Sequence, residues 1–423
     1  MRIRWVLCLC IFLGLNSSAP ALVQKTDESD LIKVSDEMIQ LTTRLRGLEP
    51  KAPILRGVKN RDEIAKYLNE HVQEEYKEGE LQNEGKMLKK LGLIPDSMDY
   101  KEFIIKLFTE QVGGFYNPEN KTFYIASWLP VEDQKPIMVH ELTHALQDQY
   151  FNIEAILEQA RKQRNDDRGM AHQALFEGDA LLVMLQSIIE PFKRHFSELP
   201  DLSFIMRTQM ATMQSQFAVY KSAPMYIQEI LLFPYAYGAS FVQQVWKHTP
   251  SWEAVNKIYS DLPASTEQIM HPEKYLTTRD NPITVDAKAY IARLGKDWKV
   301  AYKNVLGEFS LGLLLSLHST EERARRSTTG WGGDQVLLLE NTKGKDAVLV
   351  STVWDTVADA EKFYIAMDQW FVKQFPEKSR TDESPAGFSI IQNEEFNALR
   401  REGNAVRFII GMPEADSKNL VGF

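Results

Sequence analysis

Two histidines four residues apart, His140 and His144, enclose Glu141 in the pattern H-E-x-x-H. Residues at i and i+4 of an α-helix lie on one face, one turn apart, so the two imidazoles can bind a single zinc ion. Glu141 then lies beside the metal, where it can take a proton from zinc-bound water. Apolar residues flank the motif, as a buried helix requires. This context favours a zinc site over an ordinary helix that happens to carry two histidines.

A glutamate on a later helix is the candidate third ligand. Apolar periodicity predicts a helix over residues 170–189, and Glu177 falls on its apolar stripe. A buried carboxylate is costly unless it is compensated; a metal ion would compensate it, and a salt bridge is the alternative. Three protein ligands leave the fourth position of zinc open for water, which is typical of a catalytic site. Gly178 is expected to let another backbone approach closely.

Hydrolysis of a peptide bond also needs a hydrogen-bond donor for the oxyanion of the tetrahedral intermediate. Tyr235, Tyr237 and His271 are the candidates. We prefer His271, because a histidine can donate a hydrogen bond and carry charge near neutral pH. A turn-capping histidine and core tyrosines are the structural alternatives.

The start of the chain and its composition indicate an exported protein. Residues 1–21 have the charged start, apolar run and small-x-small end of a secretory signal peptide, and the run is short for a membrane span. Both cysteines, Cys8 and Cys10, lie inside it, so the mature chain is expected to have no thiol and no Cys-ligated zinc. The net charge of −9 does not suggest nucleic-acid or anionic membrane partners. We expect a secreted or periplasmic protein without a membrane span; its oligomeric state is not indicated.

Breaks in the pattern divide the chain of 423 residues into three expected domains after the signal peptide. Residues 22–110 are predicted to form a helical N-terminal scaffold, 111–326 the catalytic domain and 327–423 a small α+β domain. Residues 113–125 are predicted to form a β-hairpin, which can line the rim of a cleft or be purely structural. We expect Pro136 in the first turn of the helix that carries the motif. In the last domain the predicted strands are residues 336–340, 347–354, 387–392 and 405–410, around a helix marked by residues 360–371.

Six groups of residues cover most of the mature chain in order: 114–116 with Pro118; 140–149; 176–180; 233–235; 265–268 with 271–275; and 330–331 with 333–334. They resemble secreted bacterial zinc metallopeptidases of the gluzincin, or thermolysin-like, group, and most closely a largely uncharacterised set of exported proteins. The resemblance implies an α+β, mainly helical, zincin-like core with a small twisted sheet. It also implies zinc held by His140, His144 and Glu177, with Glu141 as the base.

One position departs from that group. Thermolysin-like enzymes often have an aspartate four residues after the ligand glutamate, to support a ligand histidine, and here that position is Leu181. Support must then come from Asp148, Asp179 or another residue. The main hypothesis is an exported zinc-dependent endopeptidase acting on peptides or proteins. The alternative is a zinc-containing envelope binding or chaperone-like protein without peptidase activity, and a narrower one is a zinc hydrolase of non-peptide amides.

Overall fold

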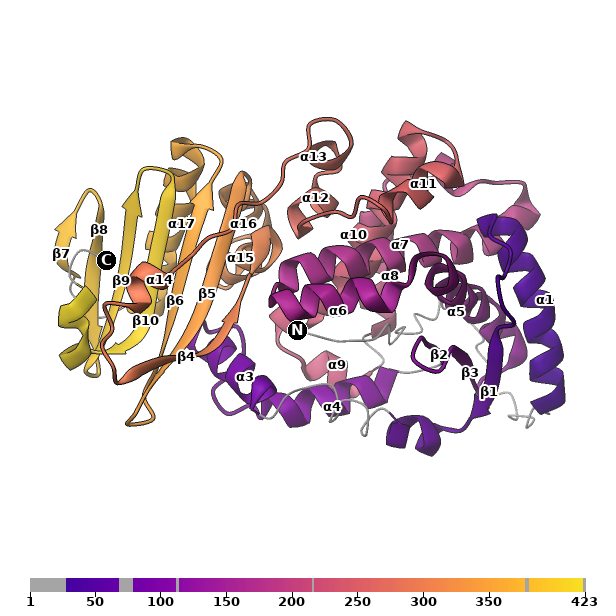
Figure 1. Ribbon diagram of the computed structural model, residues 1–423, viewed down its shortest axis with the longest axis horizontal. Coiled ribbons are helices and arrows are strands. Elements are labelled where there is room, and N and C mark those ends of the chain that lie inside the picture. Colours follow the sequence, from indigo (N-terminus) through magenta and orange to yellow (C-terminus); the bar gives the residue numbers. More distant parts are fainter. Residues whose placement is uncertain (1–27, 68–78, 112–113, 215–216, 377–379, 421–423) are drawn as a thin grey trace.

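The computed structural model describes residues 28–67, 79–111, 114–214, 217–376 and 380–420. The expected signal peptide, residues 1–21, lies outside them. The protein has a mixed α+β fold, with a bundle of helices and a three-stranded sheet at one end and a seven-stranded sheet at the other (Figure 1). Among the described helices, none combines the length and the apolar character that crossing a membrane requires.

The helical part is built around α7, which packs most extensively against α10 and α5. Its helices are α1 (Glu28–Arg46), α3 (Glu80–Lys90), α4 (Tyr100–Gln111), α5 (Val131–Phe151), α6 (Ile153–Gln163), α7 (Asp166–Ile189), α8 (Leu202–Gln214), α9 (Ala218–Ser222), α10 (Met225–His248), α11 (Trp252–Ile258), α12 (Thr266–Met270) and α13 (Glu273–Leu276), with the short 3-10 helices η1 (Glu190–Phe192) and η2 (Phe196–Glu198).

Two glycines allow α7 and α10 to cross in direct backbone contact. A Cβ atom on Gly178 of α7 would lie 2.2 Å from the carbonyl carbon and oxygen of Gly238 in α10. A Cβ on Gly238 would lie 2.0 Å from the carbonyl oxygen of Ala174. The close approach expected at Gly178 is therefore confirmed, and α10 is the partner. Because Glu177 precedes Gly178, this crossing fixes the depth of Glu177 in the core.

The helix that carries the motif begins earlier than expected. α5 starts at Val131, so Pro136 lies inside the helix, and the expectation of a first-turn proline is wrong. A proline in the interior has no N–H to donate to the carbonyl four residues before it. The next residues, including Ile137, Met138 and Val139, are buried, so tertiary packing holds this turn in place despite the lost bond.

The small sheet lies against α5. Its strands are β1 (Leu55–Lys59), β2 (Gly114–Asn117) and β3 (Thr122–Ala126), in the order β1-β3-β2. β2 and β3 form the predicted hairpin, while β1, within the expected helical scaffold, pairs in parallel with β3. Tyr116, Phe123 and Ile125 share an apolar cluster with Met138 and Leu142 of α5. The hairpin is thereby held over the motif.

The C-terminal part is a seven-stranded antiparallel sheet in the order β4-β5-β6-β10-β9-β8-β7. Its elements are β4 (Trp298–Asn304), β5 (Trp331–Asn341), β6 (Asp346–Trp354), β7 (Arg380–Ser384), β8 (Gly387–Gln392), β9 (Glu395–Glu402), β10 (Ala405–Pro413), α14 (Lys288–Ile291), α15 (Gly307–Ser316), α16 (Glu321–Thr328), α17 (Val357–Gln374) and η3 (Glu414–Leu420). The predicted strands and helix of this region are present within β5, β6, β8, β10 and α17; β4, β7 and β9 were not predicted.

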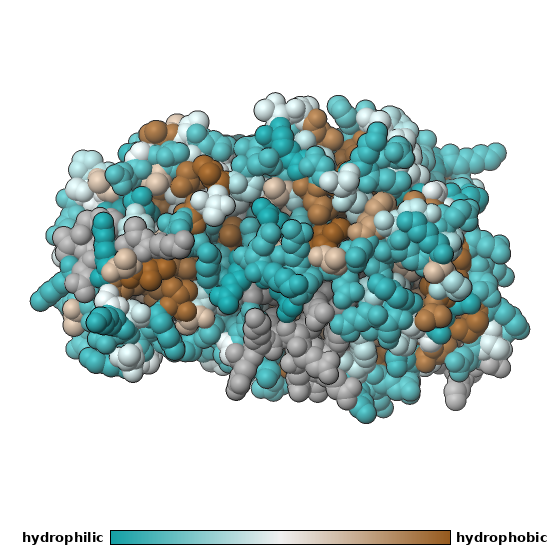
Figure 2. Space-filling model, in the orientation of Figure 1, coloured by the Kyte–Doolittle hydropathy of each residue, from teal (hydrophilic) through white to brown (hydrophobic). Residues whose placement is uncertain are grey.

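One hydrophobic core runs from the helices into this sheet. Phe176 of α7, Leu314 of α15 and Phe363 of α17 belong to the same cluster of buried side chains. Because β4 pairs with β5 and starts at Trp298, the expected domain boundary at residue 327 falls inside the sheet-bearing unit. On the face shown in Figure 2, hydrophilic residues predominate and separate the apolar patches from one another.

Four buried carboxylates lie where the two parts meet. Asp167 of α7, Glu267 of α12, Glu308 of α15 and Asp334 of β5 are each at most 3% exposed; we call this set the acidic joint. Burial raises the pKa of Asp167 to about 7 and that of Asp334 to about 6. Burial and the nearby charge of Glu308 raise the pKa of Glu267 to about 9.

Two of these carboxylates cap helices. Asp334 accepts hydrogen bonds from the backbone N–H groups of Leu306 (2.9 Å) and Gly307 (2.8 Å) at the start of α15. Asp167 accepts one from the N–H of Thr266 (3.1 Å) at the start of α12. Negative charge is favourable at the amino end of a helix, so the joint attaches α12 to α7 and α15 to β5.

Substitution of Gly178 by alanine should unfold the crossing of α7 and α10. The new Cβ would overlap the Gly238 backbone, so we expect a loss of about 3 kcal/mol in the free energy of unfolding, the upper end for overpacking, measured in urea. Gly169→Ala on the same helix is the control, because its Cβ would meet only Ala160 at 3.8 Å and should stabilise the helix by about 0.5–1 kcal/mol. Equal effects of the two changes would contradict this account.

Stability should fall as pH rises through the acidic range. The pKa of Asp167 is about 7 in the folded state against 3.8 for the free side chain. Between these pH values the folded state binds a proton that the unfolded state does not, and this contribution to stability is lost as pH rises. Asp167→Asn removes this titration. Between about pH 4 and about pH 7, the unfolding free energy of the variant should therefore fall less than that of the parent protein, by on the order of a few kcal/mol. Urea unfolding with a metal chelator present would measure it. Glu322→Gln, at an exposed carboxylate, should leave the slope unchanged.

Candidate metal centre

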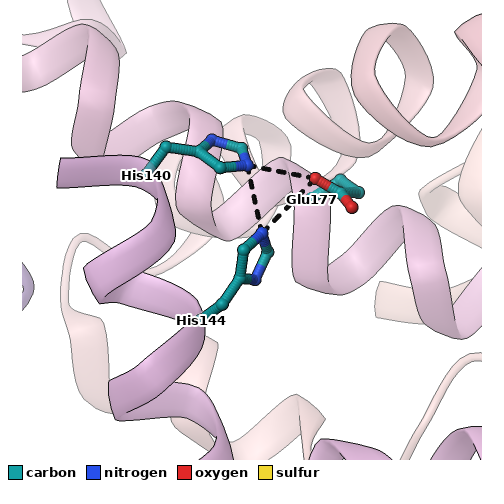
Figure 3. Close-up of side chains that lie close together, drawn as sticks. All are labelled: His140, His144 and Glu177. Carbon is teal, nitrogen blue, oxygen red and sulfur yellow. Dashed lines mark hydrogen bonds and ion pairs between the residues drawn. The ribbon is translucent and has the colours of Figure 1, made fainter. Parts of the chain in front are cut away.

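His140, His144 and Glu177 converge in the interior of the helical part (Figure 3). The Nε2 atoms of the two histidines are 3.0 Å apart. Oε2 of Glu177 lies 3.2 Å from Nε2 of His140 and 3.5 Å from Nε2 of His144. The histidines come from successive turns of α5 and the glutamate from α7, and all three are at most 5% exposed. We call these three residues the metal cluster.

The spacing of these three atoms suits a small metal ion. Donor atoms at the corners of a tetrahedron, each about 2.0–2.1 Å from a central zinc, are separated by about 3.3–3.4 Å. The observed separations of 3.0, 3.2 and 3.5 Å bracket that value. The metal cluster can therefore hold a metal ion, and two imidazoles with one carboxylate are donors that zinc accepts.

The charges within the metal cluster also suit a cation. Burial would raise the pKa of Glu177, but His144 and the hydrogen bonds from both imidazoles lower it to about 2. Burial lowers the pKa of His140, against the opposing effect of its hydrogen bond to Glu177. These effects favour an ionised Glu177 and a neutral His140, the forms that metal binding requires. Burial lowers the pKa of His144, but the Glu177 carboxylate outweighs burial and raises it, so a metal must compete with a proton for that imidazole.

Glu141 is buried on the same helix and is fixed by the hairpin. Its Oε2 atom accepts a hydrogen bond of 2.8 Å from the backbone N–H of Tyr116 in β2. The hydroxyl of Tyr116 donates to Oδ2 of Asp148 at 2.8 Å, and Lys121 donates to the same oxygen at 2.7 Å. Asp148 thus attaches the hairpin to α5 and does not orient an imidazole, contrary to one expectation from the sequence.

Gln147, which the sequence did not single out, contacts a ligand imidazole. Its Oε1 atom lies 2.8 Å from Nδ1 of His144, and its Nε2 donates to the backbone carbonyl of Phe176 at 3.0 Å. The only signal in the sequence was its place three residues after His144. Glutamine is also an ordinary helix residue, so that spacing carried little information.

Asp179, which the sequence offered as support for a ligand histidine, binds an arginine instead. It forms a fully buried ion pair with Arg46 of α1, with 2.7 Å between Nε and Oδ1, and accepts a hydrogen bond from the hydroxyl of Tyr259 at 2.7 Å. The guanidinium of Arg46 also lies over the ring of Trp252, 4.5 Å from its centroid. These contacts tie α1 and α11 to α7 two residues past Glu177. Nothing in the sequence around Arg46 indicated them.

The expected oxyanion donors lie in three different places. Nε2 of His271 is 3.1 Å from Oε1 of Glu308 in the acidic joint. The joint meets α7 at Asp167, ten residues before Glu177, which is about 15 Å along the helix. His271 therefore lies beside the acidic joint, and the structure does not support the preference for it as oxyanion donor.

The two tyrosines of α10 also differ from each other. The hydroxyl of Tyr237 accepts a hydrogen bond from Arg207 at 3.0 Å. Tyr237 also lines a cavity of about 1120 Å³ between α8, α10, α12, α13 and α16. Tyr235 is 2% exposed within α10, the helix that packs on α7. Tyr237 is therefore engaged away from the motif, and Tyr235 is the buried member of the pair.

Five of the six stretches that carry the sequence resemblance meet at two places in the fold, and the sixth, residues 233–235, lies in α10, which packs on α7. Residues 114–116, 140–149 and 176–180 lie around the metal cluster. Residues 265–268, 271–275 and 330–334 lie around the acidic joint, where Trp331 donates from its indole N–H to Asp334 at 3.0 Å. The second group therefore joins the two parts of the molecule and does not complete the metal cluster.

A comparison with protein families gives a match in the C-terminal part of the chain. A family model for a domain of unknown function, DUF8575, matches residues 298–421, which begin at β4 and exclude the metal cluster. No curated protein matches the chain. A solved structure from Chloroflexus aurantiacus, provisionally described as a hydrolase with a novel fold, is similar over 59% of this chain and 90% of that chain, at 18% identity and a TM-score of 0.39. The interpretation of the metal cluster therefore depends on its own geometry.

Zinc should bind the folded chain in a 1:1 ratio and raise its melting temperature, because the three donors meet only in the folded state. His144→Ala removes one of the three donors. Loss of a residue that only hydrogen-bonds to a ligand costs up to about 100-fold in metal affinity, so loss of the ligand itself should cost more than about 100-fold. Metal content after dialysis and a melting curve would measure both effects. His248→Ala, at an exposed histidine of α10, should bind zinc normally; zinc retained at full occupancy by His144→Ala would contradict the site.

Proposed function

We propose that this protein is an exported zinc-dependent endopeptidase in which His140, His144 and Glu177 hold zinc and Glu141 is the general base. The observation that carries the proposal is the convergence of the metal cluster beside Glu141, in the spacing that zinc requires. Zinc, when bound, supplies a Lewis acid that polarises the scissile carbonyl and makes water more acidic.

Glu141 handles the proton in this proposal. Its carboxylate takes the proton from the attacking water and passes it to the leaving amine. The N–H of Tyr116 holds one of its oxygens at 2.8 Å. Because that donor belongs to the main chain of a strand, no side-chain rotation removes it, and the carboxylate keeps its orientation while the proton moves.

The position of β2 is the argument for a peptide substrate. Among the described strands, β2 lies at the edge of its sheet, next to β3. The N–H of Tyr116 donates to Glu141, so the side of β2 away from β3 lies against the helix with the motif, where the residues of β2 are buried. An extended peptide that lay alongside β2, in the manner of strand addition, would have its carbonyl groups next to Glu141, while the Tyr116 N–H stays on Glu141.

Tyr235, buried in the helix that packs on α7, is kept as the oxyanion donor of the proposal for its position. His271 and Tyr237 bind Glu308 and Arg207 elsewhere. Their engagement is also the observation that favours the alternative function, a zinc-containing binding protein of the cell envelope without peptidase activity. A hydrolase needs a donor for the developing oxyanion, whereas a protein that only holds zinc does not.

Glu141→Gln should separate the two functions. The variant keeps all three ligands, so zinc content should stay at one per chain, while hydrolysis of an unfolded protein substrate should fall by about 10²–10⁴-fold because the amide cannot take a proton. Glu132→Gln, at an exposed glutamate of the same helix, should keep full activity. Unchanged hydrolysis by Glu141→Gln would remove Glu141 from the reaction. A zinc-loaded parent protein that cleaves no peptide substrate would favour the binding protein.

A further inference from the structure

Gln147 touches both helices that supply the metal cluster. It is fully buried on α5, one turn after His144. Its amide oxygen lies 2.8 Å from Nδ1 of His144, and its amide nitrogen lies 3.0 Å from the carbonyl oxygen of Phe176, the residue before Glu177 on α7. One side chain therefore connects one ligand to the backbone that positions another.

The Phe176 carbonyl settles the direction of these hydrogen bonds. A carbonyl can only accept, so the amide group of Gln147 that faces it must be NH₂. The other end of the amide is then the oxygen, which can only accept from Nδ1–H of His144. A neutral imidazole with its proton on Nδ1 has its lone pair on Nε2. That nitrogen is the one facing His140 and Glu177.

We propose that Gln147 is the positioning residue of the centre: it sets the tautomer and ring orientation of His144 so that Nε2 is the metal donor. The inference rests on the zinc site of the proposed function. Outer partners of ligand histidines commonly fix the ring and its tautomer in this way. Here the partner is a neutral amide, so it adds no negative charge to the two imidazoles and the single carboxylate.

Two substitutions distinguish this role from simple packing. Gln147→Met has similar length but no hydrogen-bonding group, and should weaken zinc binding by about 10–100-fold. Gln147→Glu also loses the donor to the Phe176 carbonyl, as Gln147→Met does, but it can still accept from Nδ1–H. It should therefore bind zinc within about tenfold of the parent protein, or more tightly because of its added charge. A packing role predicts the reverse order, since methionine fills the space and a buried charge is costly. Competition with a chromophoric zinc chelator would measure all affinities.

Gln134→Met is the matched control. Gln134 is a second buried glutamine of α5, 2% exposed, and its amide donates to the backbone carbonyl of Leu129 at 2.7 Å. Its loss removes a comparable side-chain-to-backbone bond on the same helix, away from His144. Zinc affinity of this variant should equal that of the parent.

The tautomer can be read without metal. In zinc-free protein labelled with ¹⁵N-histidine, at a pH above the range in which imidazole titrates, the spectrum should show His144 protonated on Nδ1 in the parent and in Gln147→Glu, but not in Gln147→Met. A parent protein in which Nδ1 of His144 carries no proton, or a Gln147→Met variant that binds zinc as tightly as the parent, would overturn the role of Gln147. A parent that binds no zinc would instead overturn the proposed function, and the tautomer measurement would still stand as a test.

Discussion

Glu177 lies in the interior between two imidazoles, and much of the helical packing serves to keep it there. A carboxylate at this depth needs compensation, and in the metal-free protein His140 and His144 provide it. The backbone contact of Gly178 with Gly238 sets the depth of the carboxylate. The position of every other group in the centre follows from how α5 and α7 are held beside each other.

The hairpin, α1 and the C-terminal sheet each hold a different part of this helix pair. β2 supplies the N–H that fixes Glu141, and Arg46 of α1 neutralises Asp179 just past Glu177. The acidic joint attaches the amino end of α7 to α12 through Asp167, and it lies beside the sheet. α7 therefore carries a metal ligand in its middle and the interdomain contact at its start, so the sheet supports the centre without contributing a donor to it.

The sequence predicted the parts of the site that depend on local periodicity. His140, His144 and Glu177 could be found because helical spacing and a carboxylate on an apolar stripe are visible in one dimension. The roles of Gln147 and Arg46 could not be found, because Phe176 and Asp179 lie 29 and 133 residues away from them in the sequence. The same holds for β1, whose partner strand β3 is tens of residues away, and no local pattern marks any of the three. The position of His271 could not be predicted for the same reason: its type suited an oxyanion donor, but its partner is Glu308 on a helix packed at the joint.

Zinc K-edge X-ray absorption on the zinc-loaded protein tests the central claim most directly, because it reports the donor atoms around the metal. The account predicts one zinc per chain, with two imidazole nitrogens and a carboxylate oxygen among the light donors at about 2.0–2.2 Å, and loss of one imidazole contribution on removal of either motif histidine. A metal that binds with other donors, or a spectrum that neither histidine substitution changes, would contradict it.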